Sequence, residues 1–146
     1  MFQGDLTKVE NITEFFDHTI TRFGGIDVAI NTVGMVLKKP FTETTESEYY
    51  LMFGINSKAA YFFLQEAGIK VNDFTMVTSL LTAYTCLYSI YAGVKAPVEH
   101  FTRAASKEFD DRGISVTAVA PGARIRLSSM VKKVPMQFHI TNLHQH

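Results

Sequence analysis

Hydrophobic residues recur at three- and four-residue steps over residues 7–23, which is the spacing of a helix with one buried face. The residues on this face are Val9, Ile12, Phe16, Ile20 and Phe23. Thr7 and Glu10 have the spacing of a capping box at the start of this helix. The pair Gly24-Gly25 follows, and glycine is the usual residue just beyond a helix end. The pattern therefore predicts a first helix over residues 7–23.

Two further helical segments follow along the chain. Thr45 with Glu48 forms a second capping-box pattern, which predicts a helix that continues to Ala67 with a break near Gly54. The last helical pattern covers residues 89–111. Its hydrophobic face consists of Val94, Val98, Phe101, Ala105 and Phe109. Pro97 lies inside this pattern and removes one helical hydrogen bond, so we expect a kink or a late start, and Gly113 marks the end.

Short hydrophobic runs between these helices predict strands over residues 26–31, 74–79 and 114–120. Strands that alternate with helices of this length are typical of an α/β fold with a parallel sheet. Ligands of such a sheet bind at the carboxyl ends of its strands. The residues expected at those ends are Asn31, Ser79 and Pro121-Gly122.

Composition narrows the function classes. The 146 residues include 14 basic and 14 acidic side chains, so nothing indicates a nucleic-acid partner held by net charge. The uncharged stretch 74–94 contains nine Ser, Thr or Tyr residues, which argues against a membrane span. A single cysteine, Cys86, is typical of a reducing compartment, and we expect a cytoplasmic protein. His139, His144 and His146 lack a nearby Cys or carboxylate, so no metal site is predicted.

Tyr91 and Lys95 stand four residues apart on a predicted helix and therefore share a face. A lysine ammonium near a phenol favours the phenolate and is expected to lower the phenol's pKa, which suits proton transfer. Ser79, at the end of the preceding strand, could donate a hydrogen bond to a carbonyl oxygen. A chance surface pair is the alternative interpretation of Tyr91 and Lys95.

Several motifs in fixed order make the pattern more specific. They are Asn31-Thr-Val-Gly34 after a strand, Asn56 in a helix, Ser79 at a strand end, Tyr91-Ala-Gly-Val-Lys95, and Pro121-Gly122 after the last strand. With these motifs the chain resembles the short-chain dehydrogenase/reductase family over residues 1–122. Thr32 and Val33 depart from the family's Asn-Asn-Ala-Gly motif.

The resemblance implies a role for each motif. Tyr91 would be the general acid/base, Lys95 would lower its pKa and hold the nicotinamide ribose, and Ser79 would orient the substrate, with Thr78 as a possible substitute. Asn56 would anchor a proton-relay water through the helix backbone. The cofactor, NAD or NADP, would also be lined by Asp5, Asn31, Gly34, Pro121 and Gly122. Structural alternatives remain open: Asn31 as a strand-end cap, Asn56 as a helix-break residue, and Asp5 as the start of a turn.

The sequence departs from the family at both ends. It contains no Gly-rich turn between a first strand and helix, which in the family holds the cofactor pyrophosphate, and only a strand remnant at residues 2–6 is expected. The predicted fold is therefore an incomplete Rossmann-like, doubly wound parallel sheet with flanking helices. Residues 1–122 would form this partial domain. Residues 123–146 match nothing in the family pattern and are predicted to be an out-of-frame or disordered tail.

Two interpretations of function stay open at the level of sequence. The resemblance implies an NAD(P)-dependent oxidoreductase that moves a hydride between the nicotinamide and a small carbonyl or alcohol substrate. The alternative is an inactive remnant or a non-catalytic association module, because the pyrophosphate-binding turn is missing. In either case the resemblance implies a homo-oligomer formed through the helices at 46–67 and 91–111.

Overall fold

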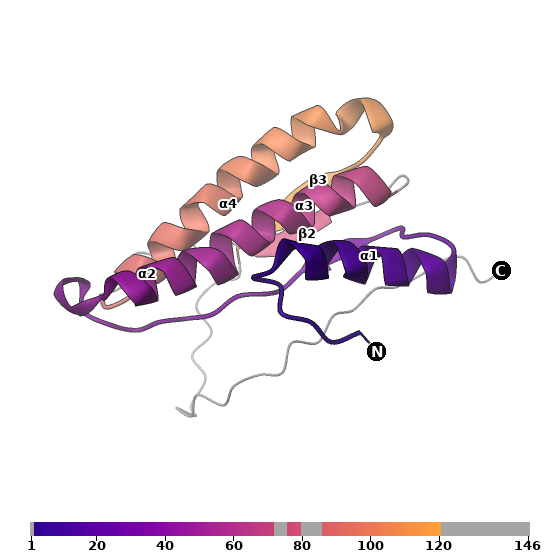
Figure 1. Cartoon of the computed structure of the whole chain (residues 1–146). Helices are drawn as coiled ribbons and strands as arrows, with labels where there is room; N and C mark the ends of the chain where they lie inside the picture. The colour runs from indigo at the N-terminus through magenta and orange to yellow at the C-terminus, as the bar shows by residue number, and fades with distance from the viewer. Residues whose placement is uncertain (1, 72–75, 80–85, 121–146) are drawn as a thin grey trace, which may run out of the picture.

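The described residues contain a three-stranded parallel sheet, which forms one layer of the fold (Figure 1). The computed structural model describes residues 2–71, the backbone of 76–79, and residues 86–120. The strands are β1 (Ala29–Asn31), β2 (Met76–Ser79) and β3 (Val116–Val119), in the order β1-β2-β3. Strands β1 and β3 are shorter than predicted, while the first two residues of the predicted strand 74–79 lie outside the described residues. The α/β class with a parallel sheet is confirmed.

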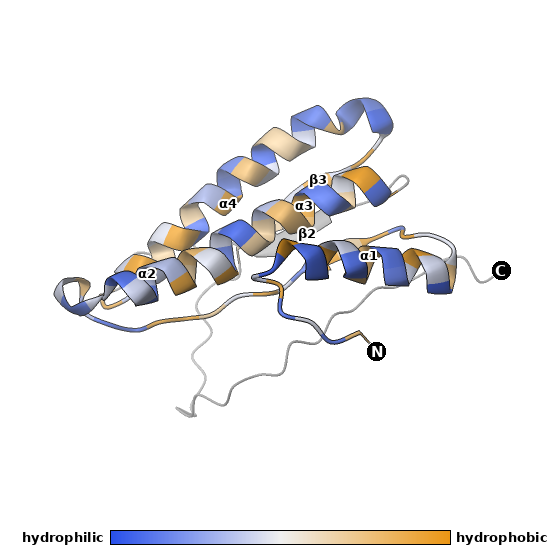
Figure 2. Cartoon of the chain, in the orientation of Figure 1, coloured by the Kyte–Doolittle hydropathy of each residue, from blue (hydrophilic) through white to orange (hydrophobic). Residues whose placement is uncertain are grey.

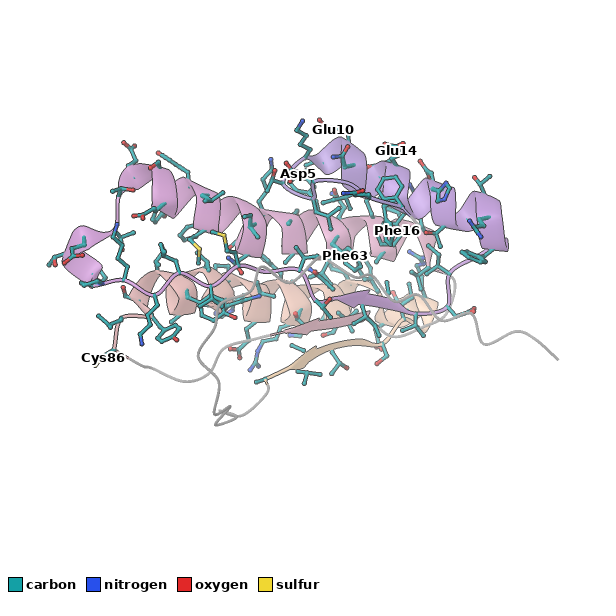
Figure 3. The ribbon with its side chains drawn as sticks, turned by 90° about the horizontal axis from the view of Figure 1, so that it is seen from below. Asp5, Glu10, Glu14, Phe16, Phe63 and Cys86 are labelled. Carbon is teal, nitrogen blue, oxygen red and sulfur yellow. The ribbon has the colours of Figure 1, made fainter. Side chains whose placement is uncertain are left out.

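Three long helices lie side by side over one face of this sheet (Figures 1 and 3). The helical elements are α1 (Val9–Phe23), α2 (Glu46–Phe53), the π-helical segment η2 (Gly54–Lys58), α3 (Ala59–Lys70) and α4 (Ser89–Glu108), with short 3-10 turns η1 (Phe41–Glu43) and η3 (Asp110–Arg112). In the described part of the chain α3 contacts β1 and β2, while α4 contacts β3. Parallel strands joined by helices on one side of the sheet are successive crossover units of the same hand.

The core lies between the helices and the sheet. Phe16 of α1 is fully buried, and its ring centroid lies 5.1 Å from that of Phe63 of α3. Both side chains are labelled in Figure 3. Burying one such aromatic side chain stabilises the fold by about 1.5–3 kcal/mol. Hydrophobic and hydrophilic residues alternate along α1 and α4, as expected of helices with one face on a core (Figure 2). Phe23, predicted on the buried face, is 55% exposed at the end of α1.

The start of α1 differs from the prediction. The helix begins at Val9 after Lys8, and no side chain caps it, so the Thr7–Glu10 capping box is wrong. Thr7 instead donates from its backbone N–H (3.0 Å) and its hydroxyl (2.8 Å) to Oδ1 of Asp5. The backbone N–H of Lys8 also bonds to the Asp5 carbonyl, which closes a turn. Residues 2–6 lead into this turn and do not form the predicted strand remnant.

The predicted capping box at α2 is confirmed. Thr45 accepts a hydrogen bond from the backbone N–H of Glu48, whose carboxylate accepts one from the Thr45 backbone N–H. The expected break near Gly54 is a π-helical turn, so the chain stays helical through to Lys70, three residues beyond the predicted end. One long helical rod with a widened turn therefore runs from Glu46 to Lys70.

Helix α4 begins at Ser89 and contains Pro97 without being ended by it. Its predicted hydrophobic face is confirmed, since Val94 and Val98 are fully buried and Ala105 is 9% exposed. Gly113 follows in the left-handed region, with φ of 72°, which glycine adopts at little cost. No helix in the described residues is long and apolar enough to cross a membrane.

The far end of the helical layer is held by polar contacts. Arg112 donates from its guanidinium to the backbone carbonyls of Gly68, in the last turn of α3, and of Val71, the residue that follows the helix. Lys70 forms ion pairs with Asp17 of α1 (2.6 Å) and Glu66 of α3 (2.9 Å). These contacts fix α1, α3 and η3 relative to one another.

Candidate active site

Tyr91 and Lys95 lie on the first two turns of α4. The helix begins after Tyr88, whose carbonyl accepts the backbone N–H of Ala92 (2.8 Å). Nζ of Lys95 lies 5.9 Å from the centroid of the Tyr91 ring, so the sequence spacing does place the two side chains together. Tyr91 is partly buried, and Lys95 is only 5% exposed.

Burial controls the ionisation of both groups. It lowers the pKa of Lys95, because a charged ammonium is poorly solvated in the interior. Burial also raises the pKa of Tyr91, and the neighbouring Tyr88 raises it further. The expected lowering of the Tyr91 pKa by Lys95 is therefore wrong for this structure. The ammonium lies over the ring at 5.9 Å, and desolvation of the phenolate dominates.

Asn56 lies in the π-helical segment and is fully buried. Its Nδ2 donates to the carbonyls of Met35 and Met52, each at 3.0 Å, and its Oδ1 accepts the backbone N–H of Met35 at 3.2 Å. The side chain thus joins the loop after β1 to the helical rod. A π-turn inside an α-helix frequently marks a functional site, because it displaces backbone groups from the regular hydrogen-bond pattern.

Gly34 brings the loop after β1 against both of these residues. A Cβ atom at this position would lie 2.9 Å from Oδ1 of Asn56 and 3.2 Å from Nζ of Lys95. The absence of a side chain at Gly34 therefore permits a close approach between the loop backbone, the buried amide and the buried ammonium. The structure brings Gly34, Asn56, Tyr91 and Lys95 into one site.

Asn31 and Asp5 have local roles in the described structure. Asn31 ends β1, is 4% exposed, and its Oδ1 accepts the backbone N–H of Val33 at 3.0 Å, which is the strand-end cap considered from the sequence. Asp5 lies beside the start of α1 (Figure 3), and its bonds to Thr7 lower the pKa of its carboxyl. The structural alternative for each residue is thus observed, and their cofactor-binding roles stay predictions.

The strand ends align as the parallel sheet requires. Asn31 of β1 pairs with Thr78 of β2, and Ser79 pairs with Val119 of β3. The backbone of Ser79 is therefore at the same sheet edge as Asn31. The side chains of Thr78 and Ser79 lie outside the described part of the chain, as do Pro121 and Gly122 and the three histidines of the tail.

Sequence reasoning missed two residues that support the site. Ser57, next to Asn56, donates from its hydroxyl to the Val94 carbonyl at 2.6 Å and so ties the π-helical segment to α4 beside Lys95. Nothing in the sequence indicated this pair. Tyr88 has its ring centroid 6.4 Å from that of Tyr91, and its place just before the helix start was the available signal.

The chain is similar to known proteins over most of its length. A family model described as enoyl-(acyl carrier protein) reductase matches residues 1–141. A hydroxynaphthalene reductase-like protein of Metarhizium brunneum is 32% identical over 125 residues, which are 82% of this chain and 47% of that protein. A short chain dehydrogenase of Claviceps purpurea is 31% identical over 129 residues, covering 84% of this chain and 48% of the relative.

Solved structures agree with these matches. A protein described as a dehydrogenase of Burkholderia cenocepacia, with bound NADP, is 58% identical with a TM-score of 0.77, covering 83% of this chain and 47% of that one. A short chain dehydrogenase of the same species in complex with NADP shares the fold with a TM-score of 0.78 at 22% identity, covering 83% and 51%. The chain spans about half the length of the proteins it matches. On these similarities, the chain belongs to the short-chain dehydrogenase/reductase family.

Proposed function

We propose that these residues supply the acid/base half of an NAD(P)-dependent oxidoreductase that acts on a small carbonyl or alcohol substrate. One observation carries the proposal. The Lys95 residue is 5% exposed, and among the described residues its ammonium contacts the Tyr91 ring and makes no hydrogen bond or ion pair. A buried charge without a partner is costly, so the site favours a ligand that offers oxygen acceptors.

The residues present fit the nicotinamide side of the cofactor. Ribose hydroxyls would supply acceptors for Lys95, whose ammonium the loop backbone approaches closely because Gly34 has no Cβ. Tyr91 and Lys95 would hold the nicotinamide ribose, Asn31 and Gly34 the adenosine side, and Asp5 the adenine, with Pro121 and Gly122 beyond β3. The 58% identical relative with bound NADP supports this assignment. When bound, the cofactor supplies or accepts the hydride.

The chain's own residues then transfer the proton to or from the substrate oxygen. With its raised pKa, Tyr91 is protonated near neutral pH and can donate its hydroxyl proton to a carbonyl oxygen. With a ligand that accepts hydrogen bonds from Lys95 and so favours its ammonium form, Lys95 would stabilise the phenolate that remains. Asn56 fixes the loop after β1 to the helical rod and would anchor a water through the helix backbone, and Ser79 would orient the substrate oxygen.

The proposed architecture is a doubly wound sheet of which residues 1–122 form one part. The helices described here cover one face, and a second layer would complete such a fold. Residues 123–146 would be an out-of-frame or disordered tail. Sequencing the gene upstream of codon 1 and through codons 122–146 tests both points. An in-frame Gly-rich strand–turn–helix upstream would supply the pyrophosphate site, and its absence would favour the inactive remnant.

Nucleotide titration tests the function directly. We expect NADPH fluorescence to change saturably with the protein, Lys95→Met to weaken binding at least tenfold, and Tyr91→Phe to abolish turnover of carbonyl substrates while preserving binding. Arg103→Met, which removes an exposed ion pair with Glu99 on the same helix, is the control and should behave as wild type. Binding that is absent, or equal in wild type and Lys95→Met, would support the non-catalytic module.

A second proposal concerns association of two copies through the helices at 46–67 and 91–111. Tyr61 is 45% exposed and Ile69 64% exposed, and both line a largely apolar groove between α3 and α4 together with Phe101. Exposed apolar surface of this kind is favourable to bury against another chain. Light scattering should report a dimer that Ala104→Arg, in the groove, converts to a monomer. Thr21→Arg on the exposed side of α1 should leave the mass unchanged.

A further inference from the structure

The turn that precedes the Tyr91 helix is held by the loop after β1. The backbone N–H of Lys39 donates to the carbonyl of Leu87 at 2.8 Å, although the two residues are far apart in the sequence. Leu87 has φ of 70°, in the left-handed region that a leucine rarely adopts. A strained residue of this kind persists only where its surroundings hold it in place.

The side chain of Lys39 is itself anchored. Its Nζ lies 2.9 Å from each carboxylate oxygen of Glu48. The same carboxylate accepts hydrogen bonds from the backbone N–H of Thr45 (2.8 Å) and from its hydroxyl (3.0 Å), which form part of the α2 cap. Glu48 thereby connects the loop to the first turn of α2.

These contacts lead directly to Tyr91. Leu87 is followed by Tyr88, whose carbonyl accepts the first helical bond of α4 from Ala92 and whose ring lies against that of Tyr91. Tyr88, the residue before α4, makes no side-chain capping hydrogen bond, so within the described residues the helix itself supplies little to fix its first turn. Nζ of Lys38 lies 6.0 Å from the centroid of the Tyr88 ring, which adds a second contact from the same loop.

We infer that Lys39 and Glu48 are positioning residues that hold the Leu87 turn, and through it the Tyr91 hydroxyl, in place from α2. The expected effect of Lys39 and Glu48 on catalysis rests on the proposed function. Their expected effect on the start of α4 does not. The competing explanation is that the ion pair only stabilises the α2 cap. The two explanations differ in what happens at α4 when the ion pair is lost.

Four substitutions separate these explanations. Glu48→Gln weakens the ion pair and keeps the cap, because Gln also serves at the third position of a capping box. Lys39→Met removes the ion pair and retains the backbone N–H. Thr45→Ala removes the side-chain cap of α2 and leaves Lys39 and Glu48 in contact, so it is the matched control. Lys39→Arg keeps the charge and should restore wild-type behaviour.

The readouts are amide hydrogen exchange at Ala92 and the NMR signal of the Tyr91 phenol carbon in the full chain. We expect Glu48→Gln and Lys39→Met to speed exchange at Ala92 at least about fivefold and to shift the Tyr91 signal. Thr45→Ala should speed exchange in α2 alone. If Thr45→Ala affects Ala92 as strongly as Glu48→Gln does, or if neither ion-pair variant changes Ala92 or Tyr91, the inference is overturned.

Kinetics give an independent check with NADPH and a carbonyl substrate. Misplacement of Tyr91 should lower kcat at least fivefold in Lys39→Met with the KM for NADPH within twofold of wild type, and Lys39→Arg should recover most of the loss. If the wild-type chain shows no turnover, the proposed function fails, and hydrogen exchange still decides whether Lys39 and Glu48 hold the Tyr91 turn.

Discussion

Nζ of Lys95 lies 5.9 Å from the centroid of the Tyr91 ring on the same face of α4, where Lys95 is buried and Tyr91 is partly buried. The two groups therefore influence each other in an environment that disfavours charge on either one. Burial raises the pKa of Tyr91 and lowers that of Lys95, so the neutral phenol and the neutral amine are both favoured relative to water. A ligand that accepts hydrogen bonds from Lys95 would favour the ammonium again.

Tyr91 should titrate above pH 10 in the free chain, because its phenolate is partly desolvated and lies near Tyr88. Replacing Tyr88 by Phe removes the neighbouring phenol that raises the Tyr91 pKa, so this pKa should fall toward 10. NMR titration of tyrosine labelled at the phenol carbon measures both values. A Tyr91 pKa below 10 in the wild-type chain, or no change in Tyr88→Phe, would contradict this assignment.

Gly34→Ala should disturb the site. The added Cβ would meet Oδ1 of Asn56. The Asn56 side chain cannot easily move away, because its Oδ1 bonds to Met35 and its Nδ2 to Met52. We expect a loss of about 1–3 kcal/mol in the free energy of unfolding, as for other overpacked positions. Urea denaturation measures it. Gly54→Ala is the control, because a Cβ there meets nothing within 4 Å and the backbone is already helical, so its stability should not fall.

Gly68→Ala should destabilise the packing of α3 against the end of α4. A Cβ at Gly68 would overlap the ring of Phe109, which packs against the hydrophobic core. The expected loss is about 1–3 kcal/mol in the free energy of unfolding. Gly93→Ala in α4 meets no atom within 4 Å and should be neutral or stabilising. Equal thermal midpoints for Gly68→Ala and wild type would show that Phe109 moves aside freely.

Stability should depend on pH through Glu48. Hydrogen bonds from Thr45 and the ion pair with Lys39 lower the pKa of this carboxyl to about 2 from its ordinary value of 4.5. The folded state therefore gains stability from Glu48 that is complete above pH 4.5 and is lost as the pH falls toward 2. The difference in urea midpoint between wild type and Glu48→Gln should be constant near neutrality and shrink below pH 4.5. If the difference in urea midpoint instead grows on acidification, Glu48 does not stabilise the fold in its ionised form.

Local patterns predicted most of the framework. The Thr45–Glu48 capping box, the buried face of α4 and the parallel sheet follow from residues close in sequence or from the alternation of strands and helices. The Thr7–Glu10 pattern failed because Asp5, two residues earlier, offers the Thr7 hydroxyl and N–H a better acceptor. Near Gly54 the pattern of side chains gave no sign that the backbone would widen into a π-turn.

The sequence by itself determined which residues could share a helix face, and so it placed Tyr91 beside Lys95. Only the tertiary structure decided how burial shifts their pKa values, because desolvation depends on what packs around the side chains from other elements. The same holds for the approach of Gly34 to Asn56 and for the bond from Lys39 to Leu87. These contacts join segments distant in the chain, and short-range periodicity carries no information about them.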